Sequence, residues 1–104
     1  MMDYQRIDQA GALEMIRNEN AVVVDIRDPA SFRSGHIAGA LHLDNRNVAE
    51  FIATADRAGP VIVCCYLGNT SQDAARFLAA QGFERCYSLD GGFKGWRLSG
   101  NPEE

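Results

Sequence analysis

The chain has 104 residues, of which 46% are hydrophobic and 23% charged, and its formal net charge is −4. This length suits one compact domain, so we expect residues 1–104 to fold as a single unit whose motifs lie between about 8 and 98. The acidic balance disfavours nucleic acid and anionic membrane surfaces as partners, because both attract basic patches. No apolar run reaches the ~20 residues that span a bilayer, and the first residues lack a signal-peptide pattern, so we expect a cytoplasmic protein.

Short runs rich in valine and isoleucine alternate with helical patterns in the first part of the chain. A short strand around Ile7 precedes Asp8, a residue type that caps helix N-termini, and apolar residues then recur at helical spacing. Residues 21–26 form a nearly continuous apolar run, which is typical of a strand buried on both faces. Asp28 and Pro29 then predict the start of a short helix, with aspartate as the cap and proline in the first turn.

The same alternation continues through the middle of the chain. Residues 40–43 predict a short strand, and a helix follows between residues 44 and 55. After a Gly-Pro break, residues 61–64 predict a second strand buried on both faces. Residues 71–81 have the pattern of an amphipathic helix, and Gly82 suits its C-terminal cap.

The last elements are a strand over residues 86–89, a turn over residues 90–92 and a short helix that carries Phe93 and Trp96. We interpret both aromatic residues as core, with a place in the wall of a ligand entrance as the alternative.

This order of elements predicts the fold class. Strands that alternate with helices pair in parallel, with right-handed crossovers and helices on both faces of the sheet. We therefore expect an α/β domain with a mainly parallel five-stranded sheet. Because ligands of such sheets bind beyond the carboxyl ends of the strands, the segments after Asp25 and after Cys64 are the candidates for a site.

Cys65 is the first residue after a buried strand, and residues 66–70 lead directly into a helix. Backbone N–H groups of a tight loop and of a helix N-terminus can converge on an anion. Such a site lowers the pKa of a neighbouring thiol because it stabilises the thiolate. Gly68 and Asn69 tolerate the positive φ angles that a curled loop requires. The pattern predicts a nucleophile beside an anion site, although a small core cysteine followed by a simple turn has the same sequence.

The remaining cysteines and the histidines point to core and local roles. Cys64 and Cys86 lie inside predicted strands, so we interpret them as core residues. The three cysteines form no recognisable disulfide framework. Adjacent cysteines lack the spacing of structural zinc sites, and His36 and His42 fit locally satisfied polar groups better than ligands. We therefore expect neither a metal nor a cofactor.

Three motifs, in this order, resemble those of the rhodanese family. Residues 65–71 read Cys-Tyr-Leu-Gly-Asn-Thr-Ser and match an active loop of the form Cys-Tyr-x-Gly-Asn-x-Ser. Residues 25–40 begin with Asp-Ile-Arg, end with Gly-His-Ile-x-Gly-Ala and resemble the family's N-terminal motif. Residues 89–96, Leu-Asp-Gly-Gly followed by a tryptophan, resemble its C-terminal motif. The resemblance therefore spans residues 25–96 and implies a rhodanese-like single domain.

The resemblance implies a sulfurtransferase that works by double displacement. The thiolate of Cys65 attacks the outer sulfur of thiosulfate, sulfite leaves, and the resulting persulfide passes its sulfur to cyanide or to a thioredoxin-like dithiol. Cys65 is then the catalytic residue. The resemblance assigns substrate binding to the rest of the loop, namely Tyr66, Leu67, Gly68, Asn69, Thr70 and Ser71. The hydroxyls of Thr70 and Ser71 either touch the sulfur or only cap the helix.

Asp25 and Arg27 are expected behind this loop, as a structural ion pair rather than as catalytic groups. Related folds that hydrolyse phosphate esters use a longer loop ending in arginine, whereas Thr70 and Ser71 stand at those positions here, so a phosphatase is disfavoured. Many rhodaneses carry a cation inside the loop and this chain carries none, which leaves thiosulfate and 3-mercaptopyruvate both open as donors. A carrier that receives sulfur from a partner protein is the other alternative.

Overall fold

The computed structural model describes residues 3–104 and contains one sheet in the order β1-β5-β4-β2-β3. Each neighbouring pair of strands is parallel, which confirms the expected α/β architecture. In the described residues, antiparallel pairing is limited to an isolated bridge between Ile37 and Glu103. The strands are β1 (Gln5–Ile7), β2 (Val22–Asp25), β3 (Leu41–His42), β4 (Pro60–Cys64) and β5 (Arg85–Leu89).

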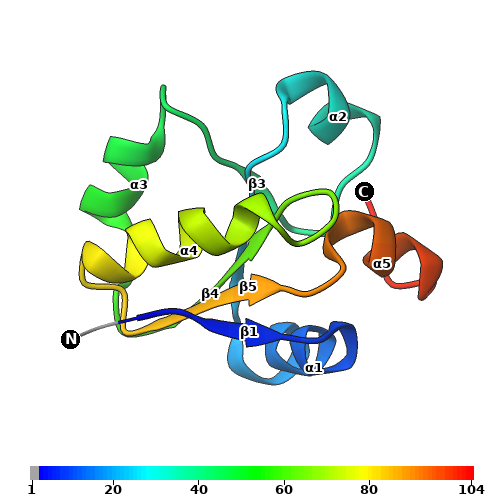
Figure 1. Ribbon diagram of the computed structural model, residues 1–104, viewed down its shortest axis with the longest axis horizontal. Helices are drawn as coiled ribbons and strands as arrows, with labels where there is room; N and C mark the ends of the chain where they lie inside the picture. Colours follow the sequence, from blue (N-terminus) through cyan, green and yellow to red (C-terminus); the bar gives the residue numbers. More distant parts are fainter. Residues whose placement is uncertain (1–2) are drawn as a thin grey trace.

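The helices cover both faces of this sheet. They are α1 (Gln9–Glu19), α2 (Pro29–Ser34), α3 (Val48–Thr54), α4 (Thr70–Ala80) and α5 (Gly92–Leu98). Figure 1 shows α3 and α4 on one side of the sheet and α1 on the other, with α2 and α5 beyond the arrowheads of the strands. Between residues 3 and 104, no helix combines the length and apolar character that crossing a bilayer requires.

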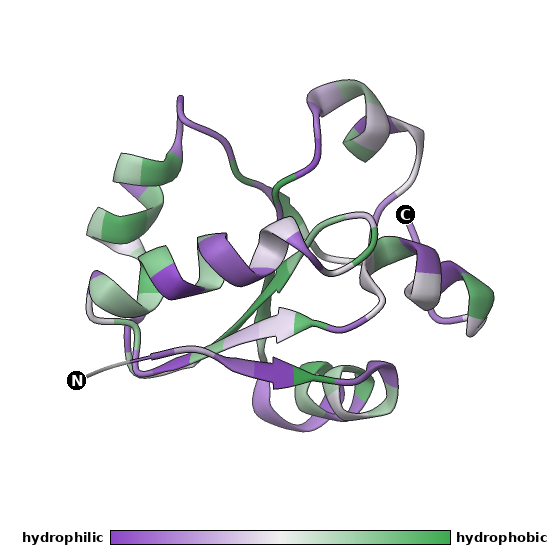
Figure 2. Cartoon of the chain, in the orientation of Figure 1, coloured by the Kyte–Doolittle hydropathy of each residue, from purple (hydrophilic) through white to green (hydrophobic). Residues whose placement is uncertain are grey.

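The side chains of β4 alternate between two cores, as the pleat of a strand dictates. Ile62 and Cys64 pack in the core beneath α1 and α5, whereas Val61 and Val63 pack in the core beneath α3 and α4. All residues of β4 are buried, and Figure 2 shows this central strand in the green of hydrophobic residues. The continuous apolar run in the sequence therefore reflects burial on both faces.

The helix signals in the sequence act as predicted. The carboxylate of Asp8 accepts a hydrogen bond from the Gly11 N–H at 2.7 Å and begins α1. The carboxylate of Asp28 accepts one from the Ser31 N–H at 3.0 Å and begins α2. Gly82 follows the end of α4 with a φ of 100°, a conformation that side chains disfavour.

Several boundaries differ from the expected ones by one or two residues. β4 begins at Pro60, since a proline at the first position of a strand need not supply a ladder N–H. The strand predicted over residues 40–43 shortens to β3, because the Ala40 N–H donates to Ile37 O at 2.9 Å within a turn. These shifts leave the element order and the faces unchanged.

The carboxyl ends of β2 and β4 lie side by side, because Asp25 pairs with Cys64 in the parallel register. The segments that follow these two residues therefore emerge at the same edge of the sheet. This is the edge at which the sequence predicts a ligand site.

Candidate active site

The active-site loop, residues 65–71, connects β4 to α4 and surrounds the thiol of Cys65. Cys65 is only 5% exposed, yet it lines a cavity of about 380 Å³. The walls of this cavity come from the segment after β2, from α2 and from α5. The thiol thus lies at the floor of a depression that small ligands can enter.

The hydrogen bonds of Cys65 favour its thiolate. The Gly68 N–H donates to Cys65 Sγ at 3.0 Å, and the hydroxyl of Ser71 lies 3.2 Å from the same sulfur. Burial raises the pKa of Cys65, but hydrogen bonds from the Ser71 and Thr70 hydroxyls and from the Ser71 and Gly68 amides outweigh burial, so the pKa lies below its ordinary value. The Ser71 hydroxyl therefore contacts the sulfur, and neither hydroxyl caps α4, whose N-cap is Asn69.

The shape of the active-site loop is set by the start of α5. The Phe93 N–H donates to Cys65 O at 2.8 Å, and the Lys94 N–H donates to Tyr66 O at 3.1 Å. Because a trans peptide places its N–H opposite its C=O, these bonds turn the amides of Tyr66 and Leu67 away from α5. Neither amide donates to an acceptor within residues 3–104. Both are therefore free to bind an anion.

Two glycines permit this close approach. Gly92 has a φ of 57°, and a Cβ there would lie 2.5 Å from Cys65 O. Gly68 has a φ of 96°, and a Cβ there would lie 2.9 Å from Leu89 O. Gly68 adopts the positive φ that its residue type tolerates, whereas Asn69 does not. Asn69 has a φ of −92°, because its backbone already turns into α4.

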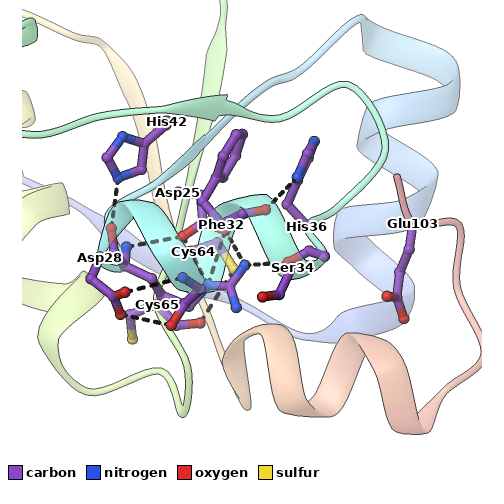
Figure 3. A network of polar contacts seen from close by, with 12 residues as sticks. Asp25, Asp28, Phe32, Ser34, His36, His42, Cys64, Cys65 and Glu103 are labelled. Atoms are coloured by element: carbon purple, nitrogen blue, oxygen red, sulfur yellow. Dashed lines mark hydrogen bonds and ion pairs between the residues drawn. The ribbon is translucent and has the colours of Figure 1, made fainter.

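Asp25 and Arg27 form the expected ion pair, and Arg27 lines the cavity. Figure 3 shows Asp25 within a network of polar contacts near Cys64. Arg27 Nε lies 3.0 Å from Asp25 Oδ1, and Nη2 lies 2.7 Å from Oδ2. Nη2 also donates to Gly35 O at 2.7 Å, and the guanidinium lies 4.2 Å from the centre of the Phe93 ring. Asp25 is fully buried, whereas Arg27 and Phe93 line the cavity with Cys65. Phe93 is thus both a core residue and part of the entrance wall.

Tyr66 and Leu67 lie at the rim of the active-site loop, where each is 52% exposed. They border a smaller hollow of about 190 Å³ that also opens at Cys65. Neither side chain is charged. The positive charge in the cavity comes instead from Arg27 and from Arg97 on α5, a residue that the sequence analysis did not single out.

A second residue absent from the sequence predictions is Ser88 on β5. Its hydroxyl lies 2.8 Å from Ser71 Oγ, and both serines are fully buried. Ser71 therefore bridges Ser88 and the sulfur of Cys65. A serine among the apolar residues of the predicted strand, residues 86–89, was the available signal, because a buried hydroxyl requires a hydrogen-bond partner.

Cys64 and Cys86 are core residues, as predicted. Burial raises the pKa of Cys64, and the neighbouring Asp25 carboxylate raises it further. Burial raises the pKa of Cys86 to about 11. Of the three thiols, only that of Cys65 lies in an environment that favours a nucleophile.

Both histidines are held by local contacts. His36 Nδ1 lies 2.8 Å from Phe32 O, and the His36 ring stacks on that of Phe32 with centroids 3.8 Å apart. His42 Nε2 lies 2.7 Å from Arg27 O. In the part of the chain that the structure describes, no three histidine, cysteine, aspartate or glutamate side chains gather as a metal site.

Known proteins resemble the chain along most of its length. The model of the rhodanese-like domain matches residues 8–99. The thiosulfate sulfurtransferase GlpE of Pseudomonas putida is 56% identical over 99 residues, which cover 95% of this chain and 90% of that protein. The protein of the same name from Stutzerimonas stutzeri is 56% identical over 97 residues, with 93% and 88% covered.

Solved structures share the fold. The crystal structure of a rhodanese-related protein from Thermoplasma volcanium superposes with a TM-score of 0.82 at 28% identity, over 97% of this chain and 98% of that one. A Rhodopseudomonas palustris protein, described as a possible tyrosine phosphatase, superposes with a TM-score of 0.82 at 25% identity, over 97% and 85%. With the sequence matches and the loop around Cys65, these findings show that the chain belongs to the family of rhodanese-like domains.

Proposed function

We propose that the protein is a thiosulfate sulfurtransferase that carries sulfur as a persulfide on Cys65. The observation that carries this proposal is the thiol itself. Its sulfur accepts a hydrogen bond from the Gly68 N–H at 3.0 Å, and hydrogen bonds within the loop lower its pKa. Cys65 also lines a cavity. The relatives at 56% identity are named for this reaction.

In the first half-reaction, the thiolate of Cys65 attacks the outer sulfur of thiosulfate. The Cys65 S–S bond forms as the S–S bond of thiosulfate breaks, and the bonding electron pair leaves with sulfite. The persulfide that remains carries one negative charge. Nucleophilic catalysis of this kind divides one transfer into two steps.

In the second half-reaction, a thiophilic acceptor removes the outer sulfur and restores the Cys65 thiolate. Cyanide becomes thiocyanate. A thioredoxin-like dithiol becomes a disulfide and releases sulfide, because its second thiol displaces the transferred sulfur. We propose these two classes of acceptor. The reaction needs a reduced Cys65, so we also propose a cytoplasmic location.

The active-site loop offsets the unfavourable charge of the whole molecule. The free amides of Tyr66 and Leu67 and the N-terminus of α4 supply fixed positive dipoles next to the sulfur. Arg27 adds a positive charge. Its Nε and Nη2 bind Asp25 and Gly35, whereas its Nη1 takes part in none of these bonds. We propose that the loop residues Tyr66 to Ser71 bind the donor and that the Asp25–Arg27 pair positions the mouth of the site.

A carrier function is the second candidate, and the exposed rim favours it. Tyr66 and Leu67 are both 52% exposed beside the thiol, where a partner protein that donates sulfur would make contact. In that case a persulfide forms from a protein donor and not from thiosulfate.

The test measures the two products of the reaction, sulfite and thiocyanate. The protein is mixed with thiosulfate alone, and we expect one sulfite per molecule in an initial burst. Addition of cyanide then gives thiocyanate with continuous turnover. Cys65→Ser abolishes both signals, whereas Cys86→Ser, which removes a buried thiol elsewhere, retains them.

Other donors separate the alternatives. If 3-mercaptopyruvate gives a burst of pyruvate and thiosulfate gives no burst of sulfite, the sulfur donor is 3-mercaptopyruvate. Loading of Cys65 by a persulfidated protein alone establishes the carrier function. Thiocyanate formation that survives Cys65→Ser rejects the mechanism, and hydrolysis of p-nitrophenyl phosphate by the wild type supports a phosphatase.

A further inference from the structure

The side chains of three residues from different elements form a line inside the protein. Ser88 on β5 lies 2.8 Å from Ser71 at the start of α4, measured between the hydroxyl oxygens. Ser71 Oγ in turn lies 3.2 Å from Cys65 Sγ. Ser71 is the one hydrogen-bond partner of the Ser88 hydroxyl within residues 3–104. Ser88 is fully buried, and its one partner in this range contacts the nucleophile, so Ser88 can influence the site.

We propose that Ser88 is a positioning residue for the reaction at Cys65. When Cys65 is a thiolate, the Ser88 hydroxyl donates to Ser71 Oγ and keeps the Ser71 hydrogen directed at Cys65 Sγ.

A hydroxyl has one hydrogen, so Ser71 donates either to Cys65 Sγ or to Ser88 Oγ. A thiolate can only accept, so Ser71 donates to the sulfur and Ser88 donates to Ser71. Each donor polarises the next, and a charged acceptor gains more from this than a neutral thiol does. Ser88 thereby favours the thiolate without touching it.

Because both serines are buried, Ser88 positions a hydroxyl and does not transfer a proton. Ser71 and Ser88 are both 0% exposed, so the line of hydroxyls ends inside the protein and cannot deliver a proton to solvent. The proton of Cys65 must leave through the cavity. Ser88 thus acts by orienting a dipole, and its effect is a shift in the titration of Cys65.

The other groups that bear on this titration stay constant in the test. The charged or titratable side chains that line the cavity with Cys65 are Arg27, Asp28, Tyr66 and Arg97. Behind the loop, Cys64 precedes the nucleophile and lies beside Asp25. Ser88 contacts none of them through a hydrogen bond.

The experiment measures the rate at which iodoacetamide alkylates Cys65 as a function of pH, with peptide mass mapping to separate the three cysteines. Ser88→Ala removes the hydroxyl, and Ser88→Thr restores it. Cys86→Ala is the matched control, because it removes one buried atom from the same strand, two residues away. Ser88→Cys, which keeps a weaker donor, replaces the threonine variant if that variant does not fold.

We expect Ser88→Ala to raise the apparent pKa of Cys65 by roughly half a unit, which lowers the thiolate fraction about threefold below the pKa. Ser88→Thr should return most of that shift, and Cys86→Ala should cause none. A pKa in Ser88→Ala within about 0.2 units of the wild type overturns the proposal. An equal shift in Cys86→Ala also overturns it, because the cause is then general loosening of the core.

The role of Ser88 in catalysis rests on the proposed function, whereas its effect on the pKa of Cys65 is measured independently of that function. Alkylation needs no sulfur donor and no turnover. A missing pKa shift therefore rejects the role of Ser88 and leaves sulfur transfer standing. A missing persulfide rejects sulfur transfer and leaves the alkylation result unchanged.

Discussion

Replacement of Gly92 by alanine perturbs the contact between the start of α5 and the active-site loop. The new Cβ would lie 2.5 Å from Cys65 O and would also meet Tyr66 O. Both atoms belong to the backbone and cannot rotate away. The loop must move until the contact reaches an ordinary distance, which displaces the amides that surround the sulfur.

The expected cost has two parts. Alanine at a φ of 57° costs about 1–2 kcal/mol, because its Cβ crowds the following carbonyl. The displacement also weakens the bonds from Phe93 N–H to Cys65 O and from Lys94 N–H to Tyr66 O, at about 0.5–1.5 kcal/mol each. We therefore expect Gly92→Ala to lower the free energy of unfolding by about 2–5 kcal/mol.

Gly100→Ala supplies the matched control. Gly100 has a φ of 70°, and no atom of residues 3–104 outside its neighbours lies within 4 Å of the position of its Cβ. Alanine there therefore carries only the conformational cost of about 1–2 kcal/mol. Urea unfolding measures stability, and the rate of sulfite release in the burst measures the site. We expect Gly92→Ala to slow the burst by roughly 100-fold, as for a misplacement approaching 1 Å, and Gly100→Ala to leave it unchanged. Equal destabilisation by the two variants, with wild-type bursts in both, would refute the reasoning.

Three further predictions concern thiol reactivity, ion pairing and capping. At neutral pH, iodoacetamide should alkylate Cys65 alone until the protein unfolds, and equal labelling of another cysteine contradicts the assigned environments. Asp25→Asn should cost about 3–5 kcal/mol in urea unfolding, because a buried guanidinium loses its carboxylate, whereas Asp90→Asn in an exposed pair should cost far less. Hydrogen bonds from Ser31 lower the pKa of Asp28, so its cap stabilises the fold above the ordinary aspartate value of about 3.9 and is lost as pH falls through the folded-state pKa. Wild type and Asp28→Ala should therefore differ in melting temperature at neutral pH and converge in acid, and a constant difference contradicts this.

The sequence predicts the fold well where local patterns and burial agree. Residues 21–26 and 61–64 are apolar because two covered faces demand it, and they become β2 and β4. The position of Cys65 at the carboxyl end of a central strand then follows from the general geometry of parallel sheets. The confirmed cap at Asp8 likewise depends only on neighbouring residues.

Contacts between distant segments were beyond reach of the sequence. Ser88 meets Ser71 only because β5 lies next to β4 and α4 packs over both, and no local pattern encodes that neighbourhood. The same holds for Gly92, which the sequence marks as a turn but whose small size serves the approach of α5 to the loop. Asn69 belongs to a residue type that tolerates a positive φ, but the start of α4 gives it a φ of −92°.

The central claim, that Cys65 carries one transferable sulfur atom, is tested most directly by intact mass spectrometry. After incubation with thiosulfate and removal of excess reagent, the protein should gain the mass of one sulfur atom, and cyanide should reverse the gain. Cys65→Ser should gain nothing, while Cys86→Ser should behave as the wild type does. An unchanged wild-type mass, or an equal gain in Cys65→Ser, would contradict the account.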